Sequence, residues 1–173
     1  MIRVLVHDKR LGGGKPPSDR FDAMLQVDRR DPLAFILGWV QSKAKQFGYI
    51  DELHLYAHGI EKGGKLGFGV LLGADNITHL NVHQWGVLDG WVEWIQLLAC
   101  GAASTQSGSG GQGDGMTLCS YLAGYSRSWL TASMDKQIYM RNVFGEIEMG
   151  GWEGRVYSWD PWGTLYCQGP LDD

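Results

Sequence analysis

Two apolar segments of this chain are each followed directly by a residue with a reactive side chain. Residues 53–57 are followed by His58-Gly59, and residues 94–99 are followed by Cys100. Short apolar runs of this kind are typical of strands buried on both faces of a parallel sheet. Parallel strands bring their carboxyl ends to one edge of the sheet, where open α/β folds hold their ligands. The sequence therefore predicts an imidazole and a thiol at the same sheet edge.

Further strands and helices alternate along the chain. Asp31 is expected to cap a helix that begins near Pro32 and ends at Gly48, and Asn81 is a candidate cap for a second helix. This alternation predicts an α/β fold with a largely parallel sheet. The expected strands are 2–6, 53–57, 91–99 and 129–133, with β segments at 65–72, 137–143 and 155–159, and helices are expected at 33–47, within 75–88 and at 116–125.

The composition limits the class of protein. At 173 residues, with 44% hydrophobic and 20% charged residues, the chain fits one globular domain. The formal net charge of −4 argues against a nucleic-acid partner, because nucleic-acid-binding surfaces normally carry a basic surplus. The only basic doublets, Lys9-Arg10 and Arg29-Arg30, stand beside acidic residues and are interpreted as solvated surface charges.

The cysteines and the apolar runs bear on the compartment. Cys100, Cys119 and Cys167 are odd in number and have no CxxC spacing, which argues against a disulfide framework and a structural zinc site. Cys119 is expected in the core. The amino-terminal apolar run is too short for a signal peptide, and no run approaches the roughly 18 apolar residues that span a bilayer. We expect a protein that is cytoplasmic where it is synthesised and has no membrane partner. Export without a cleaved signal peptide and the oligomeric state stay open.

The motifs His58-Gly59 and Ala99-Cys100-Gly101, each after an apolar strand, resemble the histidine and cysteine blocks of the caspase-like (clan CD) cysteine peptidases. That group includes caspases, metacaspases and CHAT domains. An offset of 42 residues separates the histidine from the cysteine, close to the roughly 50 residues noted for caspases.

The resemblance covers residues 1–140 and makes residues 141–173 a β-rich extension of the same domain. It implies a caspase-like three-layer sandwich, in which helices flank a mostly parallel central sheet. It also implies a cysteine endopeptidase that acts on a protein or peptide substrate and uses no cofactor or metal.

The resemblance assigns a role to each residue of the two motifs. Cys100 is the nucleophile and His58 the general acid and base. A free thiol is mostly protonated at neutral pH, and a neighbouring imidazole promotes the reactive thiolate. The main-chain N–H groups of Gly59 and Cys100 would form the oxyanion hole. One departure from the family pattern is Leu98, because caspases have Gln at that place.

The resemblance also places the first specificity pocket at the strand ends. The expected lining residues are Asp8, Gln96 or Leu98, and residues 133–135 with Ser133 and Asp135. Inward-facing Asp8 and Asp135 would favour a basic P1 side chain through a charge-assisted contact. If Lys9 or Arg10 faced inward instead, the preference would change to Asp.

Two other functions stay open. A caspase-like domain without activity would serve as a protein-interaction module. A metal hydrolase would use His79 and His83, which are four residues apart, with His54 and His58 as further ligands. Residues 101–115, rich in glycine and serine, are expected to form a mobile loop in any of these cases.

Overall fold

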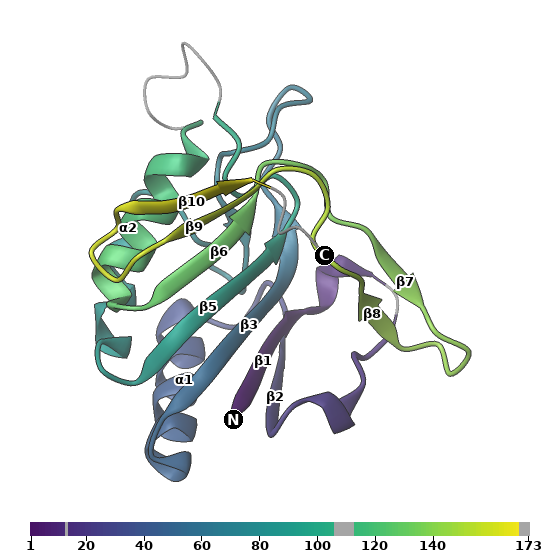
Figure 1. Ribbon diagram of the computed structural model, residues 1–173. Helices are drawn as coiled ribbons and strands as arrows, with labels where there is room; N and C mark the ends of the chain where they lie inside the picture. Colours follow the sequence, from purple (N-terminus) through teal and green to yellow (C-terminus); the bar gives the residue numbers. More distant parts are fainter. Residues whose placement is uncertain (13, 106–112, 170–173) are drawn as a thin grey trace.

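A mixed, mostly parallel β-sheet forms the centre of the computed structural model, which describes residues 1–12, 14–105 and 113–169 (Figure 1). Its eight strands have the order β10-β9-β6-β5-β3-β1-β2, with β4 paired to β3, and β7 and β8 form a separate hairpin. The strands are β1 (Arg3–Asp8), β2 (Ala23–Val27), β3 (Ile50–Gly59), β4 (Val70–Leu71), β5 (Val92–Ala99), β6 (Trp129–Ser133), β7 (Tyr139–Arg141), β8 (Ile147–Met149), β9 (Val156–Trp159) and β10 (Leu165–Gly169). The helices are α1 (Leu33–Phe47), α2 (Gly115–Ser126) and the 3₁₀ helices η1 (Lys9–Leu11), η2 (Ser18–Arg20) and η3 (Val82–Leu88).

The predicted α/β class with a mostly parallel sheet is confirmed. Strands β2, β1, β3, β5 and β6 are mutually parallel, whereas β9 and β10 are antiparallel additions. The segments predicted as strands at 53–57, 91–99 and 129–133 are β3, β5 and β6. The predicted extension, residues 141–173, supplies β9 and β10, which continue the same sheet. Strand β2 is an additional edge strand that the sequence did not predict.

Helix α1 forms because its apolar residues recur at helical spacing. The buried stripe consists of Leu33, Ile36, Leu37, Val40 and Ala44. Gly48 ends the helix with a φ of 86°, a left-handed conformation that glycine adopts without strain. The prediction that Asp31 caps the helix is wrong, because its Oδ2 accepts the N–H of Asp28. The carboxylate of Asp75 accepts the Leu33 N–H instead, at 2.8 Å.

Two other predicted elements are shorter or of a different type. Residues 75–88 contain the 3₁₀ helix η3, and the Asn81 side chain bonds the preceding loop rather than capping this helix. Of the predicted β segment 65–72, only β4 is a strand. Gly67 and Gly69 have φ values of 99° and 125°, which interrupt an extended strand.

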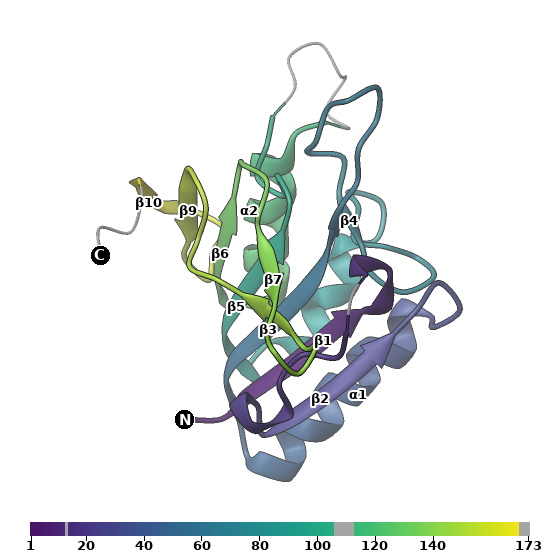
Figure 2. The ribbon, with the colours of Figure 1, turned by 90° about the vertical axis from the view of Figure 1, so that its right-hand side faces the viewer.

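The two faces of the central sheet are covered differently. Helices α1 and α2 with η3 lie on one face, and the β7–β8 hairpin lies on the other (Figures 1 and 2). In β3, Leu55 and Ala57 join the helix-side core, whereas Tyr56 joins a cluster on the hairpin side, as strand alternation requires. Among the described residues no α-helix covers the hairpin side, so the helices on both faces that the resemblance implies are not seen there.

The hairpin side is closed by the β7–β8 hairpin and by the connection from β1 to β2. Its hydrophobic cluster consists of Leu5, Leu11, Tyr56 and Leu98, with Phe21, Met24, Tyr139, Met149 and Trp152 packed against it. The Ile147 N–H donates to the Lys15 carbonyl at 3.2 Å, and Arg20 pairs with Glu148 at 3.0 Å. These contacts hold the hairpin against the β1–β2 connection.

Two further predictions concern membranes and the glycine-rich loop. In the part of the chain that the structure describes, no helix has the length and apolar character needed to cross a bilayer. The middle of the predicted mobile loop, residues 106–112, lies outside the described residues.

Replacing Leu55 by Ala is expected to lower the free energy of unfolding by about 2–5 kcal/mol, because the truncation leaves a cavity in the central strand. Leu55 is fully buried. Urea-induced unfolding followed by tryptophan fluorescence measures the change. Leu80→Ala is the control, since Leu80 is 88% exposed, and it should stay within about 0.5 kcal/mol of the wild type. Equal losses in the two variants would contradict this core.

Candidate active site

His58 lies near the end of β3, and Cys100 directly follows the parallel neighbour β5, at the carboxyl edge of the sheet. Ala57 of β3 and Ala99 of β5 form the last pair of the parallel register. His58 directly follows Ala57, and Cys100 directly follows Ala99. Strand alternation places His58 on the same side of the sheet as Tyr56, the side that the hairpin covers. The parallel register therefore brings the backbones of His58 and Cys100 to neighbouring positions at the sheet edge.

Hydrogen bonds to main-chain carbonyls orient both side chains. His58 Nε2 lies 2.9 Å from the Arg10 carbonyl oxygen, and Cys100 Sγ lies 3.6 Å from the Gln137 carbonyl oxygen. A carbonyl oxygen can only accept, so Nε2 of His58 carries a proton. In the neutral ring Nδ1 is then unprotonated and is the nitrogen that can accept a proton. This ring state is the one that a general base needs.

Gly59 allows the backbones of β3 and β5 to approach closely beside the thiol. A Cβ atom at this position would overlap the carbonyl oxygen of Cys100. The fold itself therefore requires glycine here, because the chain's own carbonyl already fills the space that a side chain would take. Gly101 then turns the chain with a φ of 56° and donates its N–H to the Asp135 carbonyl at 2.9 Å.

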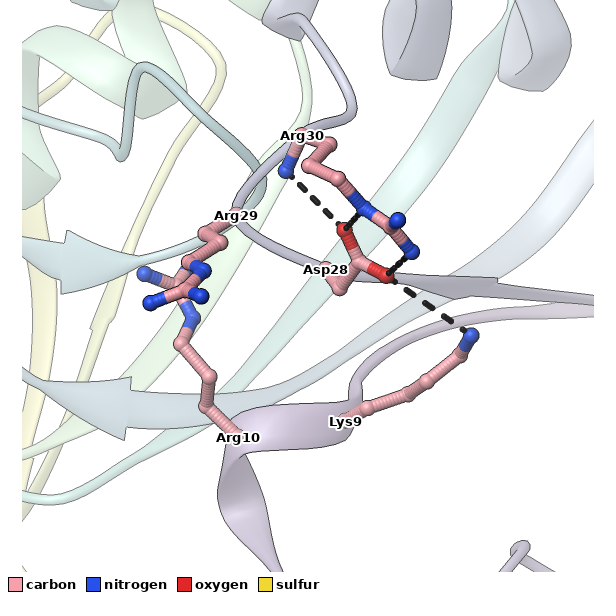
Figure 3. Close-up of a pocket in the computed structure, with 5 residues that line it drawn as sticks. All are labelled: Lys9, Arg10, Asp28, Arg29 and Arg30. Atoms are coloured by element: carbon pink, nitrogen blue, oxygen red, sulfur yellow. Dashed lines mark hydrogen bonds and ion pairs between the residues drawn. The ribbon is translucent and has the colours of Figure 1, made fainter.

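A basic pocket lies at the same sheet edge, beyond the ends of β1 and β2 (Figure 3). It has a volume of about 460 Å³ and is lined by Lys9, Arg10, Asp28, Arg29 and Arg30. The two basic doublets, interpreted from the sequence as separate solvated surface charges, come together in this pocket. The doublets lie close together because β1 and β2 are parallel neighbours whose last paired residues are Asp8 and Val27. Lys9-Arg10 directly follows Asp8, and Arg29-Arg30 follows Val27 after one residue.

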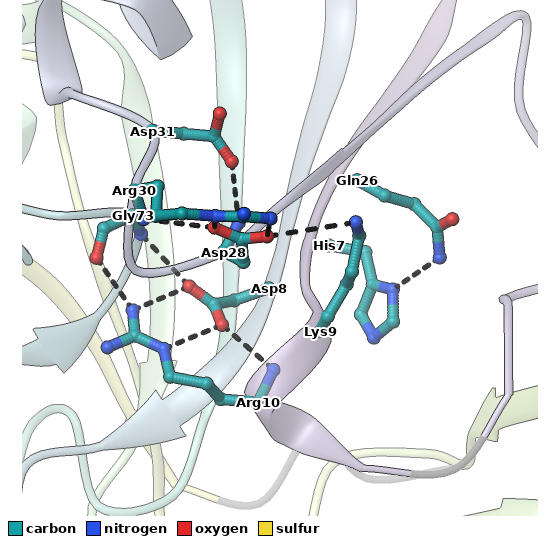
Figure 4. Close-up of polar contacts among 9 residues, drawn as sticks. All are labelled: His7, Asp8, Lys9, Arg10, Gln26, Asp28, Arg30, Asp31 and Gly73. Carbon is teal, nitrogen blue, oxygen red and sulfur yellow. Dashed lines mark hydrogen bonds and ion pairs between the residues drawn. The ribbon is translucent and has the colours of Figure 1, made fainter.

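Arg10 of this pocket is fixed by an ion pair with Asp8, the last residue of β1 (Figure 4). The Asp8 side chain is fully buried and accepts four hydrogen bonds, three from the Arg10 main chain and guanidinium and one from the Gly73 N–H. Burial alone would raise the pKa of Asp8, but these hydrogen bonds outweigh it, so the pKa lies below its ordinary value. Arg10 Nη2 also donates to the Gly73 carbonyl at 2.8 Å.

Gln96 and Ser133, which were also predicted to line the specificity pocket, do not lie together at the sheet edge. Gln96 lies within β5, paired with His54 of β3, and is therefore back from the sheet edge. Ser133 is buried, and its hydroxyl donates to the carbonyls of Glu153 and Arg155. The structure does not bring these side chains together with Asp8.

Asp135 does lie beside the nucleophile segment, through its main-chain bond to Gly101. Its carboxylate accepts the Arg155 N–H at 2.8 Å, and its side chain remains 43% exposed.

The main-chain carbonyls of Arg10 and Gln137, which bond His58 and Cys100, were not predicted from the sequence. A main-chain acceptor can come from any residue type, so no sequence signal could have identified them.

The histidines of the metal alternative have separate partners. His79 and His83 contact the rings of Tyr121 and Tyr125, and His54 bonds Glu52 at 2.9 Å. Within the described ranges, no three His, Cys, Asp or Glu side chains are arranged to hold a metal ion.

Cys119, in contrast to Cys100, is fully enclosed. Its thiol lies 3.8 Å from the Ala102 carbonyl, and burial raises its pKa. The prediction that Cys119 belongs to the core is confirmed. A buried thiol with a raised pKa is a poor nucleophile.

Comparisons of the chain with protein-family models, curated proteins and solved structures gave no significant match.

Replacing Asp8 by Asn is expected to lower the free energy of unfolding by about 1–3 kcal/mol at pH 7, because Arg10 loses its charged partner. The native pKa of Asp8 lies below the ordinary value of 3.8, so the ion pair stabilises the fold above that value and is lost as the pH falls through the native pKa. The gap between variant and wild type should therefore shrink from pH 7 to pH 3 in urea-induced unfolding. Asp19→Asn, at an exposed carboxylate, is the control. A gap that does not change with pH would contradict the ion pair.

Proposed function

We propose that the chain is a cysteine endopeptidase in which Cys100 and His58 form a catalytic dyad. The observation that supports this most directly is their position one residue beyond the last register pair of two parallel strands, at the edge where α/β sheets bind ligands. A thiol and an imidazole in adjacent positions are the equipment of nucleophilic acyl transfer. The caspase-like three-layer sandwich is part of the same proposal.

In the proposed first step, Nδ1 of His58 takes the thiol proton and the Cys100 thiolate attacks the scissile carbonyl. The Arg10 carbonyl would keep the ring in the required tautomer and stabilise the imidazolium that forms. The N–H groups of Gly59 and Cys100 are proposed to receive the oxyanion. His58 then protonates the leaving amine, and water releases the acyl group from the sulfur.

The substrate would replace a contact that the chain makes with itself. The thiol now faces the Gln137 carbonyl, in the segment that joins β6 to the β7–β8 hairpin. Gln137 is buried, and its side chain bonds the main chain of Asp135 and of Glu153. A peptide carbonyl approaching Cys100 would take the place of this internal acceptor.

The proposed preference for a basic P1 side chain now depends on Asp135. The Asp8 carboxylate is buried and its charge is neutralised by Arg10, so it offers no free charge to a substrate. Asp135 lies close to the segment that carries the nucleophile, and its 43% exposed carboxylate forms an ion pair with Arg155 at 3.7 Å. A basic P1 side chain would take the place of Arg155 in this pair.

One observation favours the alternative of an inactive interaction module. Cys100 and His58 each bond a main-chain carbonyl, and no hydrogen bond joins their side chains in the described part of the chain. An inactive domain would keep this arrangement, whereas an active one would bring Nδ1 and Sγ together when substrate binds.

Cys100→Ala and His58→Ala are each expected to reduce peptide cleavage by on the order of 10⁴-fold, because removing one member of a catalytic unit costs nearly as much as removing both. Initial rates on a fluorogenic peptide library measure the change. His83→Ala is the matched control, since His83 is exposed and lies away from the sheet edge, and it should retain the wild-type rate.

A peptidyl thiol-reactive probe separates the two functions. An active peptidase should be labelled at Cys100 in the native protein, and Cys119→Ala should leave that labelling unchanged. Folded wild-type protein that neither cleaves the library nor reacts with the probe would support the interaction module and overturn the peptidase. Wild-type turnover in purified Cys100→Ala would also overturn it.

A further inference from the structure

The basic pocket beyond β1 and β2 carries more positive charge than its own carboxylates neutralise. Four of its five lining side chains are cationic, and Asp28 is the only acid among them. Even when the neighbouring Asp8 and Asp31 are counted, positive charges exceed negative ones by one. The chain as a whole has a net charge of −4, so this local excess runs against the overall balance.

Two of the arginines are held in place by carboxylates. Arg10 forms a bidentate pair with Asp8, and Arg30 forms one with Asp28 at 2.9–3.1 Å, while Lys9 reaches the same Asp28 at 4.0 Å (Figures 3 and 4). Hydrogen bonds from Arg30 keep the pKa of Asp28 well below its ordinary value, so this carboxylate stays charged. The Arg10 guanidinium, held by the buried Asp8, loses little further side-chain freedom on binding a ligand, whereas Arg30 is 83% exposed.

Arg29 has no such partner. No hydrogen bond or ion pair is formed by its guanidinium within residues 1–12, 14–105 and 113–169. In Figure 3 the Arg29 and Arg10 side chains extend into the pocket from opposite sides, Arg29 from the loop after β2 and Arg10 from η1, which follows β1. An anion in the pocket would give the Arg29 guanidinium the charged acceptor that it lacks.

The position in the sheet also points to a ligand. From β1 the chain passes to β2 on one side and then, through α1, to β3 on the other side. Open α/β sheets bind ligands outside the carboxyl ends of the strands where the order reverses in this way. Arg10 follows β1 directly and borders this crevice.

We propose that this pocket binds a phosphate-bearing small molecule. A phosphate group carries up to two charges and three free oxygens, which match guanidinium donors that approach from two loops. A volume of about 460 Å³ exceeds what a single carboxylate needs and lies in the range of small-molecule sites. This site goes beyond the proposed peptidase and does not depend on it.

The test is isothermal titration of the full chain with inorganic pyrophosphate at low salt. Wild-type protein should bind, and Arg29→Gln and Arg30→Gln should each weaken the affinity by about 10-fold or more, because each removes charge-assisted hydrogen bonds. Arg30→Gln also leaves Lys9, at 4.0 Å, as the cation paired with the Asp28 carboxylate. Arg141→Gln makes the same chemical change at an exposed position on β7 and should bind as the wild type does. The melting temperatures of the variants confirm that they are folded.

Two further titrations decide the ligand class and the link to catalysis. Citrate that binds as tightly as pyrophosphate would overturn the phosphate assignment and indicate a carboxylate ligand, such as an acidic peptide. Cys100→Ala should bind pyrophosphate with unchanged affinity, whether or not the peptidase proposal holds. Absence of wild-type binding at about 1 mM pyrophosphate, or equal binding by all variants, would overturn the site.

Discussion

The buried ion pair between Asp8 and Arg10 is the contact on which this sheet edge depends. Asp8 ends the first strand with its side chain fully enclosed, and a carboxylate in that position must be fully hydrogen-bonded to remain charged. Arg10 supplies most of those bonds and is thereby fixed. Its carbonyl then orients His58, and its guanidinium borders the basic pocket. One ion pair therefore determines the geometry of the proposed dyad and of the proposed phosphate site.

The two sites adjoin at the same sheet edge, because Arg10 offers its carbonyl to one and its guanidinium to the other. The proposed dyad lies toward the hairpin side, where the Gln137 carbonyl meets the thiol. The Asp8 side chain points to the same face of β1 as Val4 and Val6, which belong to the helix-side core. Its ion pair with Arg10 therefore lies on the helix side of the sheet. A parallel sheet offers both positions because strand carboxyl ends meet at one edge while neighbouring side chains point to opposite faces.

The sequence predicted the elements whose signal is local. Strands β3, β5 and β6 are apolar runs, and α1 is an apolar stripe that glycine ends, so pattern alone was sufficient. Strand β2 was missed because only Val27 of its five residues is buried and its side chains do not alternate regularly between apolar and polar. The contacts that build the sites are not local. The Asp8–Arg10 pair is visible only once Asp8 is known to be buried, and the two basic doublets meet only because β1 and β2 are paired. The requirement for Gly59 likewise comes from a carbonyl on another strand.

The most direct test of the central claim is the crystal structure of the protein treated with a peptide aldehyde. The account predicts a covalent bond from Cys100 Sγ to the aldehyde carbon, with Nδ1 of His58 facing the sulfur and Nε2 still bonded to the Arg10 carbonyl. The Gln137 carbonyl should no longer contact the thiol. An aldehyde that leaves Cys100 unmodified, or a His58 ring that turns away from both the sulfur and Arg10, would contradict the account.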